Sequence, residues 1–248
     1  MRTSLPIGLS YLCDIHYMMI LRSLLFNIFF YAGTVFIAVG LSPLLLLPRP
    51  VAIALGRFWG YYTNLCLRIF VGISHEMRGD MHLSRQVIYA AKHQSAWETM
   101  TLCWRLNGPV IILKKELSRL PFVGWFMLRS GAIAVDRKAG MKALKSLRKE
   151  AISAQKSGRS LQIYPQGTRV QPGQSADYQV GIYAIYDATN LPVIPIALNS
   201  GHYWGPRAFL KKPGTIAVSF LPEIEPGLSR KEFMSRLENA IETEMARL

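Results

Sequence analysis

The feature that most constrains this chain is an uncharged, apolar run of 26 residues from Ser23 to Pro48. As an α-helix the run would measure roughly 39 Å at about 1.5 Å per residue, which exceeds the roughly 30 Å hydrocarbon core of a bilayer. The core helix of a water-soluble protein is rarely apolar on every side over such a length. A cleaved signal peptide also fits poorly, because about twenty residues precede the run. We therefore expect a retained membrane anchor that ends or kinks near Pro43.

A second apolar stretch, from Val51 to Ile73, contains two positive charges. Arg57 and Arg68 lie eleven residues apart, which is about three helical turns and places them on one face. This pattern is typical of a helix in the membrane interface, although a second span with its arginines reaching toward the headgroups gives the same pattern. The sequence therefore predicts a membrane-anchoring segment at residues 1–74, formed by one helix or by a helical hairpin.

The composition narrows the class of protein. Hydrophobic residues make up 50% and charged residues 18% of the 248 residues, which excludes intrinsic disorder. The formal charge of +14 predicts an anionic partner, namely nucleic acid, acidic lipid or a phosphorylated substrate. Nucleic acid is disfavoured because no binding module for it is visible and it leaves the apolar run unexplained. The three cysteines are scattered, so neither a disulfide framework nor a metal site is expected.

After Asp80 the sequence alternates short β-rich runs with amphipathic stretches, which predicts an α/β domain at residues 75–248. The expected strands are Val87–Ala91, Val110–Leu113, Gly131–Asp136, Ser160–Tyr164, Val193–Leu198 and Thr215–Phe220. The expected helices are Ala96–Leu106, Met141–Gln155, Tyr178–Ala188 and a last helix that begins at a capping box of Ser229 and Glu232. We predict a largely parallel sheet flanked by helices.

Two histidines are each followed by an acid five residues later, His93 by Glu98 and His75 by Asp80. His93 follows an apolar strand and opens an expected helix, so it should lie at the carboxyl end of a parallel strand, where α/β proteins bind ligands. Glu98 can accept the Nδ1 proton of His93 and leave Nε2 free as a base for a hydroxyl. On spacing and placement alone, a structural role for His93 is the commoner alternative. His75 lies in a polar, turn-prone stretch before the first expected strand, and we interpret its spacing as coincidence.

A second polar segment at a strand end is Tyr164–Arg169, with the sequence Tyr-Pro-Gln-Gly-Thr-Arg. Gly167 permits close approach of the backbone to a ligand, and we expect Arg169 to point into the same crevice as His93. Arginine binds phosphate through paired, charge-assisted hydrogen bonds, but a salt bridge or a solvated loop explains Arg169 equally well. Lys114 and Arg137 each end another expected strand, so part of the basic charge is expected to face this crevice.

Four segments in this order resemble the glycerolipid acyltransferase family, and within it the 1-acyl-glycerol-3-phosphate acyltransferase branch. They are His93–Glu98, Gly131–Arg137, Tyr164–Arg169 and Val193–Ala197, and the stretch Leu113–Leu117 is also similar to the family. The resemblance covers roughly residues 75 to 225. Because four blocks agree in order and spacing, it is more specific than any single motif.

The resemblance implies transfer of an acyl group from acyl-CoA or acyl carrier protein to the sn-2 hydroxyl of lysophosphatidic acid, giving phosphatidic acid in phospholipid biosynthesis. It implies that His93 removes the hydroxyl proton and that Glu98 orients the imidazole, with no metal ion, cofactor or covalent acyl-enzyme. The substrate phosphate would be held by Lys114, Arg137, Gly167, Thr168 and Arg169, and Val193–Ala197 would line the acyl-chain side.

The anchor would bring this active site to membrane lipid. The arginines after the apolar run outnumber those before it, with Arg49, Arg57 and Arg68 following and Arg2 and Arg22 preceding. Because positive charge tends to stay on the cytoplasmic side, we expect a bacterial inner-membrane protein whose active site faces the cytoplasm.

Two positions depart from the usual pattern of that family, which has aspartate where this chain has Glu98 and glutamate where it has Gln166. We expect the longer Glu98 to keep the contact with His93 if the backbone retreats slightly. Gln166 keeps its hydrogen-bonding capacity but loses a negative charge, which would make the phosphate site more cationic or shift the acceptor preference. Two alternatives remain: an acyltransferase for another lyso-lipid such as lyso-ornithine lipid, and a catalytically weakened homologue that binds membrane lipid.

Overall fold

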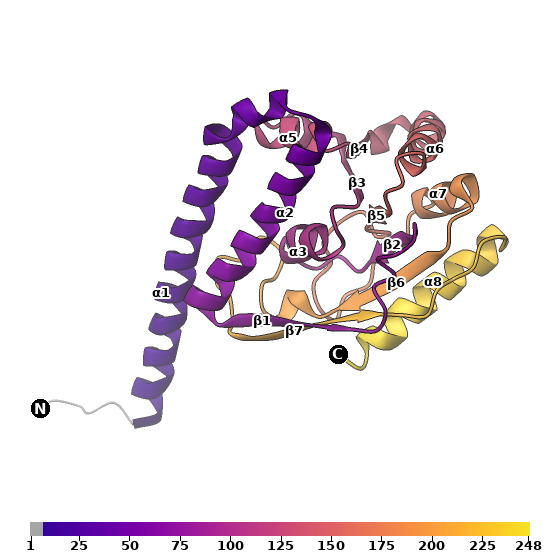
Figure 1. Ribbon diagram of the computed structural model, residues 1–248. Helices are drawn as coiled ribbons and strands as arrows, with labels where there is room; N and C mark the ends of the chain where they lie inside the picture. The colour runs from indigo at the N-terminus through magenta and orange to yellow at the C-terminus, as the bar shows by residue number, and fades with distance from the viewer. Residues whose placement is uncertain (1–6) are drawn as a thin grey trace, which may run out of the picture.

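The computed structural model describes the backbone of residues 7–248 and the side chains of residues 16–248. Its centre is a seven-stranded sheet with the order β1-β7-β6-β2-β5-β3-β4 (Figure 1). The strands are β1 (Ile73–Arg78), β2 (Ile88–Ala91), β3 (Val110–Lys114), β4 (Ile133–Val135), β5 (Leu161–Ile163), β6 (Val193–Leu198) and β7 (Gly214–Phe220). The strands from β6 to β4 run parallel, β7 is antiparallel to β6, and β1 is parallel to β7. The predicted α/β class with a largely parallel sheet is confirmed.

Helices cover both faces of the sheet (Figure 1). One face carries α6 (Met141–Gln155), α7 (Gly181–Thr189) and α8 (Arg230–Met245), and the other carries α3 (Trp97–Arg105) and the N-terminal helices. Successive strand residues point to opposite faces, so Tyr89 of β2 packs with the α3 side while Ile88 packs with the α6 to α8 side. The sheet therefore separates two hydrophobic clusters.

The expected elements are present, with three additions. All six expected strands and the helices α3, α6 and α7 are found, and Ser229 Oγ accepts a hydrogen bond from the Glu232 N–H at the start of α8. The prediction of a polar turn around His75 is wrong, because residues 73–78 form the edge strand β1, paired with β7. Two short helices that the sequence did not predict, α4 (Lys115–Ser118) and α5 (Val123–Arg129), follow β3.

The N-terminal helices α1 (Ile7–Val35) and α2 (Arg49–Cys66) lie side by side as a hairpin (Figure 1). A π-helical turn (Phe36–Gly40) and a 3₁₀ helix (Ser42–Leu46) join them, and a second π-helical turn (Leu67–Val71) extends α2. Among the described side chains, two hydrogen bonds connect the helices, from Tyr62 Oη to the Phe29 carbonyl (2.6 Å) and from Trp59 Nε1 to Thr34 Oγ1 (3.0 Å). Arg2 and the side chain of Cys13, the first of the three cysteines, lie outside the described residues.

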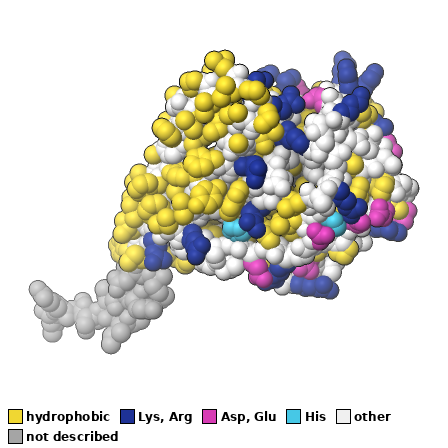
Figure 2. Space-filling view, in the orientation of Figure 1, with side chains coloured by type: hydrophobic (Ala, Val, Ile, Leu, Met, Phe, Trp, Pro, Cys, Tyr) yellow, Lys and Arg dark blue, Asp and Glu magenta, His cyan; other side chains and the backbone are white. Residues whose placement is uncertain are grey.

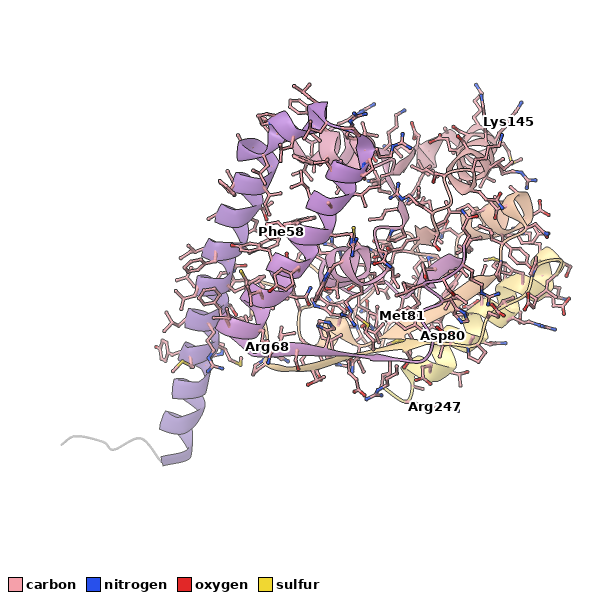
Figure 3. All side chains as sticks on the ribbon, viewed as in Figure 1. Phe58, Arg68, Asp80, Met81, Lys145 and Arg247 are labelled. Atoms are coloured by element: carbon pink, nitrogen blue, oxygen red, sulfur yellow. The ribbon has the colours of Figure 1, made fainter. Side chains whose placement is uncertain are left out.

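The hairpin carries a broad apolar outer surface. In the described part of the chain, one helical stretch, His16–Gly40, is long and apolar enough to cross a membrane, and only 22% of its most apolar window is buried. Figure 2 shows hydrophobic side chains gathered over α1 and α2, with basic residues at the border, and Figure 3 labels Phe58 and Arg68 on the segment that follows the turn. Lys145 on α6 projects into solvent on the other side of the molecule (Figure 3). The basic face of α6 is therefore solvated and lies away from the hairpin.

The hairpin is fixed to the sheet region by direct packing. Asn64 of α2 donates to Thr101 Oγ1 (2.9 Å) and accepts from Trp97 Nε1 (3.0 Å), which joins α2 to α3. On α1, the fully buried Phe26 packs edge-on against Trp204, with ring centroids 5.3 Å apart. Strand β1 begins at Ile73, so it crosses the boundary proposed at residue 74. Both helices of the hairpin are thus in contact with the α/β region.

Candidate active site

The polar segments singled out in the sequence follow four neighbouring strands, β2, β5, β3 and β4. These strands are parallel, so their carboxyl ends meet at one edge of the sheet. His93 follows β2 and Gln166 follows β5, while Lys114 ends β3 and Arg137 follows β4. The sheet topology therefore gathers at one edge residues that are up to 73 positions apart in sequence.

His93 and Glu98 are in direct contact where β2 turns into α3. His93 Nδ1 lies 2.8 Å from Glu98 Oε1, which also accepts hydrogen bonds from the backbone N–H groups of Gln94 and Ser95, both at 2.7 Å. The second oxygen, Oε2, accepts from Ser200 Oγ at 2.8 Å. Glu98 is completely buried, so these four donors replace the water that would otherwise solvate its charge. The carboxylate holds the proton on Nδ1 and leaves Nε2 of His93 free to accept one.

The longer side chain at position 98 reaches His93 because the chain folds back around it. The N–H groups of Gln94 and Ser95 point at the carboxylate in the same way as at a helix N-terminus, and they hold it at the first turn of α3. An aspartate side chain is shorter by one methylene, so on this backbone its carboxylate would not reach both His93 and Ser200. The turn between β2 and α3, residues 92–96, is called the elbow below. Its shape therefore fits glutamate at position 98.

The ring of Tyr164 packs against one face of the His93 imidazole. The rings of His93 and Tyr164 stack with centroids 4.1 Å apart and an interplanar angle of 23°. Burial, and next the negative charge of Glu98, raises the pKa of the Tyr164 phenol well above its ordinary value. Its hydroxyl accepts a hydrogen bond from Gln162 Nε2 at 2.6 Å. The neutral Tyr164 ring therefore fixes the plane of the His93 ring. Of the His93 side chain, 14% stays exposed for a substrate.

Gln166 connects the two motif segments through its amide. Its Oε1 accepts a hydrogen bond from the backbone N–H of His93 at 3.3 Å, and its Nε2 has no partner among the described residues. Only 3% of Gln166 is exposed. The contact with His93 needs one acceptor oxygen, which glutamine and glutamate both provide. The unpaired Nε2 is a buried donor next to the turn between β2 and α3.

The loop after β5 carries the residues predicted to bind phosphate. Gly167 has φ +70°, and a Cβ there would lie 3.0 Å from Arg137 Nη1, so a side chain is disfavoured both by the backbone and by this neighbour. Arg137 Nη1 donates to the Gly167 carbonyl, and burial lowers the pKa of this guanidinium. The structure thus brings Arg137 to the loop.

The other predicted phosphate ligands are placed differently. Thr168 and Arg169 are exposed, and neither side chain makes a hydrogen bond within the part of the chain that the structure describes. Lys114 is also exposed, and its Nζ lies 3.7 Å from Glu116 Oε1. Arg137 therefore contacts the loop that carries Arg169, whereas Lys114 lies near Glu116 of α4.

Sequence reasoning missed Ser200 and Gln94. Ser200 follows β6 and donates to Glu98. The backbone N–H of the next residue, Gly201, donates to Gln94 Oε1 at 3.1 Å. Because β6 is parallel to β2, the residues after both strands lie at the same edge. The order of the strands was the information needed to find them, and no local motif supplies it.

An apolar pocket lies on the α3 side of the sheet. It lies between the hairpin, α3 and α5, and its wall includes Trp59, Thr99, Met100, Cys103 and Phe126. Thr99 is the residue after Glu98, while Arg159 closes the opposite end near the amino-terminal edge of the sheet. Burial raises the pKa of the Cys103 thiol to about 11, so this side chain is neutral. Val193–Ala197, predicted to line the acyl-chain side, belong to the buried strand β6 between β2 and β7 and do not line this pocket.

A buried ion pair lies directly behind the elbow. Lys92 Nζ contacts both carboxylate oxygens of Glu242 on α8, at 2.6 and 2.8 Å, and Tyr178 Oη donates to the same carboxylate at 2.8 Å. Lys92 precedes His93, and Tyr178 precedes Gln179, whose N–H donates to the Pro165 carbonyl. Glu242 therefore connects α8 to both polar segments of the site.

Comparison with known proteins gives consistent matches. Residues 73–199 match the model of the acyltransferase family. A 1-acyl-sn-glycerol-3-phosphate acyltransferase of Pseudomonas aeruginosa is 36% identical over 165 residues, which are 66% of this chain and 64% of that protein. A protein of the same name from Limnanthes alba is 30% identical over 76% of this chain and 68% of that protein.

A solved structure shares the fold. The crystal structure of the 1-acyl-sn-glycerophosphate (LPA) acyltransferase from Thermotoga maritima matches with a TM-score of 0.72 and 22% identity. The match covers 92% of this chain and 97% of that one, so it includes the hairpin as well as the sheet. The chain matches less than two thirds of the length of the Pseudomonas aeruginosa relative.

Proposed function

Because the chain belongs to the acyltransferase family, we propose that it moves a fatty acyl group from a thioester donor to the sn-2 hydroxyl of 1-acyl-sn-glycerol 3-phosphate. The product is phosphatidic acid, and the donor is acyl-CoA or acyl carrier protein. The observation that carries this proposal is the 2.8 Å contact between His93 Nδ1 and the buried Glu98, which leaves Nε2 as a base. The names of the Pseudomonas aeruginosa and Limnanthes alba relatives support the choice of acceptor.

The reaction proceeds by direct transfer. His93 Nε2 takes the proton of the sn-2 hydroxyl as its oxygen forms a bond to the thioester carbonyl carbon. Glu98 stabilises the imidazolium that results. The tetrahedral intermediate then collapses, the carbon–sulfur bond breaks, and the thiolate leaves with the proton from His93. The thioester already carries an activated acyl group, so the proposed chemistry requires neither a metal ion nor a cofactor.

The acceptor phosphate binds at the loop after β5. Arg169 is exposed and unpaired in the described part of the chain, and Arg137 contacts the backbone of the same loop. Two guanidinium groups suit the planar, paired hydrogen bonding of a phosphate. Gly167 and Thr168 shape the loop, and Lys114 contributes long-range positive charge from the end of β3. This ligand set supports a phosphorylated acceptor over lyso-ornithine lipid.

The acyl chain of the donor occupies the apolar pocket beside α3. Thr99, the residue after Glu98, lines this pocket together with Met100 and Phe126, which supports an acyl chain that runs from a thioester carbonyl near His93 into the pocket. A Cβ on Gly56, which also lines the pocket, would lie 3.7 Å from Cys103 Sγ. We expect Gly56→Leu to shift the preference toward shorter acyl chains, which a competition between donors of different length measures.

The hairpin holds the active site at a membrane, where the acceptor and the product reside. Its exposed apolar side chains and the basic residues at its border support association with an anionic bilayer. We place the protein at the bacterial inner membrane with the active site on the cytoplasmic side.

Release of free thiol from oleoyl-CoA tests the reaction, with purified protein in detergent and lysophosphatidic acid as acceptor. Turnover that is lost in His93→Ala supports the proposal, and parallel assays with acyl carrier protein identify the donor. Lyso-ornithine lipid is the second acceptor. Turnover with that lipid alone would replace the proposed acceptor, and no turnover with either lipid and either donor would favour a lipid-binding homologue.

A further inference from the structure

The segment formed by α4, α5 and their connection exposes large apolar side chains far from the hairpin in sequence. Leu117, Leu120, Trp125 and Leu128 are 41%, 46%, 51% and 47% exposed. Phe122 packs against Trp125 with ring centroids 4.9 Å apart, although its φ of +60° is unfavourable for a bulky residue. Four large apolar side chains exposed within twelve residues are unusual for a surface in contact with water alone.

Helix α5 separates this exposed surface from the apolar pocket. Val123, Phe126 and Met127 point inward and line the pocket, whereas Trp125 and Leu128 lie on the outer face. The spacing of the two sets follows the helical period. One short helix is therefore a wall with an apolar surface on each side.

The outer face of α5 is continuous with the hairpin turn. Arg129 donates from Nε to the Leu45 carbonyl (2.9 Å) and from Nη2 to the Leu47 carbonyl (2.7 Å), which fixes the end of α5 to the turn. In that turn Leu46 is 88% exposed. The hydrophobic surface in Figure 2 extends from the helices of the hairpin over this turn. The apolar side chains of both segments therefore belong to one surface.

Positive charge surrounds this surface. Arg49, Arg119 and Arg129 are exposed beside it, and the two acids nearest in sequence, Glu116 and Asp136, each lie close to a lysine, Lys114 or Lys115. Exposed leucine and tryptophan bordered by arginine suit the interface of an anionic bilayer, where aromatic rings lie at the level of the headgroups.

We propose that residues 115–129, the α4–α5 segment, form a second membrane-inserting surface that contacts an anionic bilayer together with the hairpin turn. This extends the proposed function, because the segment becomes the wall between the bilayer and the pocket assigned to the acyl chain. A lipid bilayer is favoured over a second protein because the surface continues an apolar helix long enough to cross a membrane. The bilayer then covers α5 on its outer face and the acyl chain covers it on its inner face.

Fluorescence quenching by nitroxide-labelled lipid tests the insertion directly. Trp125 is the one exposed tryptophan of the five in the chain, since Trp59, Trp97, Trp104 and Trp204 are partly or wholly buried. Vesicles of phosphatidylethanolamine and phosphatidylglycerol with a shallow nitroxide should quench the wild type, and Trp125→Phe should lose at least half of that quenching. Equal fractional quenching of the two proteins would overturn the proposal.

Vesicle binding provides a second, independent measurement. Trp125→Ser/Leu128→Ser should bind the same vesicles about tenfold more weakly, because two half-exposed apolar side chains no longer enter the bilayer. Ile152→Ser on α6 removes a side chain of similar exposure (40%) on the other side of the sheet and should bind like the wild type. Circular dichroism verifies that each variant is folded.

The outcomes separate this proposal from the proposed function, since neither quenching nor vesicle binding depends on turnover. A double variant that binds like the wild type would show that the hairpin alone contacts the membrane. A lipid-free dimer that the double variant abolishes would instead assign the surface to a second copy of the chain.

Discussion

His93 and His75 are each followed by an acid five residues later, but they lie in different kinds of backbone. Between His93 and Glu98 the chain leaves β2 and enters α3, which brings the two side chains within 2.8 Å. His75 lies inside β1, where the extended chain to Arg78 moves about 3.3 Å per residue away from it. Asp80 accepts a hydrogen bond from the N–H of His82 instead. Equal spacing therefore produces a contact only where the backbone turns between the two residues.

The surroundings of the two histidines differ as much as their backbones. The His75 ring packs against Trp97 and Trp104 of α3, with centroids 5.7 and 5.9 Å away. Burial, followed by the positive charge of Arg105, lowers its pKa. His93 has a buried carboxylate on Nδ1 and an exposed edge. One histidine is built into the packing of α3 and the other is available to a substrate.

Replacement of each histidine gives the largest expected difference. His93→Ala should lower kcat about 10³-fold, because a positioned general base contributes a factor of that order. His75→Ala should retain most of the activity at 25 °C, because it removes packing and no reacting group. Thiol release under identical conditions measures both, and a comparable loss of kcat in the two variants would contradict the distinction.

Glu98 is expected to show the next largest effects. Glu98→Gln should lower kcat about 10²-fold, because an amide can donate to Nδ1 and so stabilise the wrong tautomer of His93. Glu98→Asp should cost about tenfold, because the shorter side chain cannot reach both His93 and Ser200. Activity at pH 7 to 8 measures both, with Ser200→Ala as the control that removes the Oε2 contact alone. Wild-type kcat in Glu98→Asp would show that the elbow is not adapted to glutamate.

The ion pair behind the elbow should affect stability more than chemistry. Glu242→Gln leaves the Lys92 ammonium, which is 2% exposed, without its counter-ion. We expect a loss of about 2–3 kcal/mol in the free energy of unfolding, at the low end of the range because Glu242 is itself partly exposed. Denaturant unfolding measures this loss. Lys92→Met/Glu242→Leu, which removes both charges, should recover most of it, and a further loss in the double variant would contradict the assignment.

The contrast between the two histidines also shows how far the sequence alone predicts the fold. Met141–Gln155 was predicted with the bounds of α6, because a helical period is encoded locally. Strand β1 was missed because Ser74, His75 and Glu76 have the polar composition of a turn. It is an edge strand whose partner β7 is about 140 residues away, so long-range pairing determines its structure.

The part of the site at the end of a single strand was predictable from the sequence. The parts formed where several elements meet were not. The contact between His93 and Glu98 followed from the change from strand to helix, and the structure contains it. Ser200 needed the order of the strands, and the apolar pocket needed the packing of the hairpin on α3. These features depend on tertiary contacts, which one sequence does not specify.

Gln166 is expected to give a smaller effect than the residues at the elbow. Gln166→Glu keeps an acceptor for the His93 N–H and should change kcat less than about fivefold. Gln166→Leu leaves that N–H unpaired and should cost about tenfold. Assays with lysophosphatidic acid at saturating donor compare them. If Gln166→Glu abolished activity, the unpaired Nε2, rather than the acceptor oxygen, would be the group that matters.

The smallest expected effect is the pH dependence of stability that His75 contributes. Because its pKa is lowered in the folded protein, the unfolded chain binds a proton first as the pH falls below about 6.5. The free energy of unfolding should therefore decrease from that pH downward until the folded-state pKa is passed. His75→Phe keeps an aromatic ring between the tryptophans and removes the titration, so its stability should fall less steeply between pH 6.5 and 5. Urea unfolding in detergent at a series of pH values measures the two slopes, with the exposed His202→Phe as control. Parallel slopes in the wild type and His75→Phe would mean that His75 can be protonated without cost in the fold, and the contrast with His93 would then rest on geometry alone.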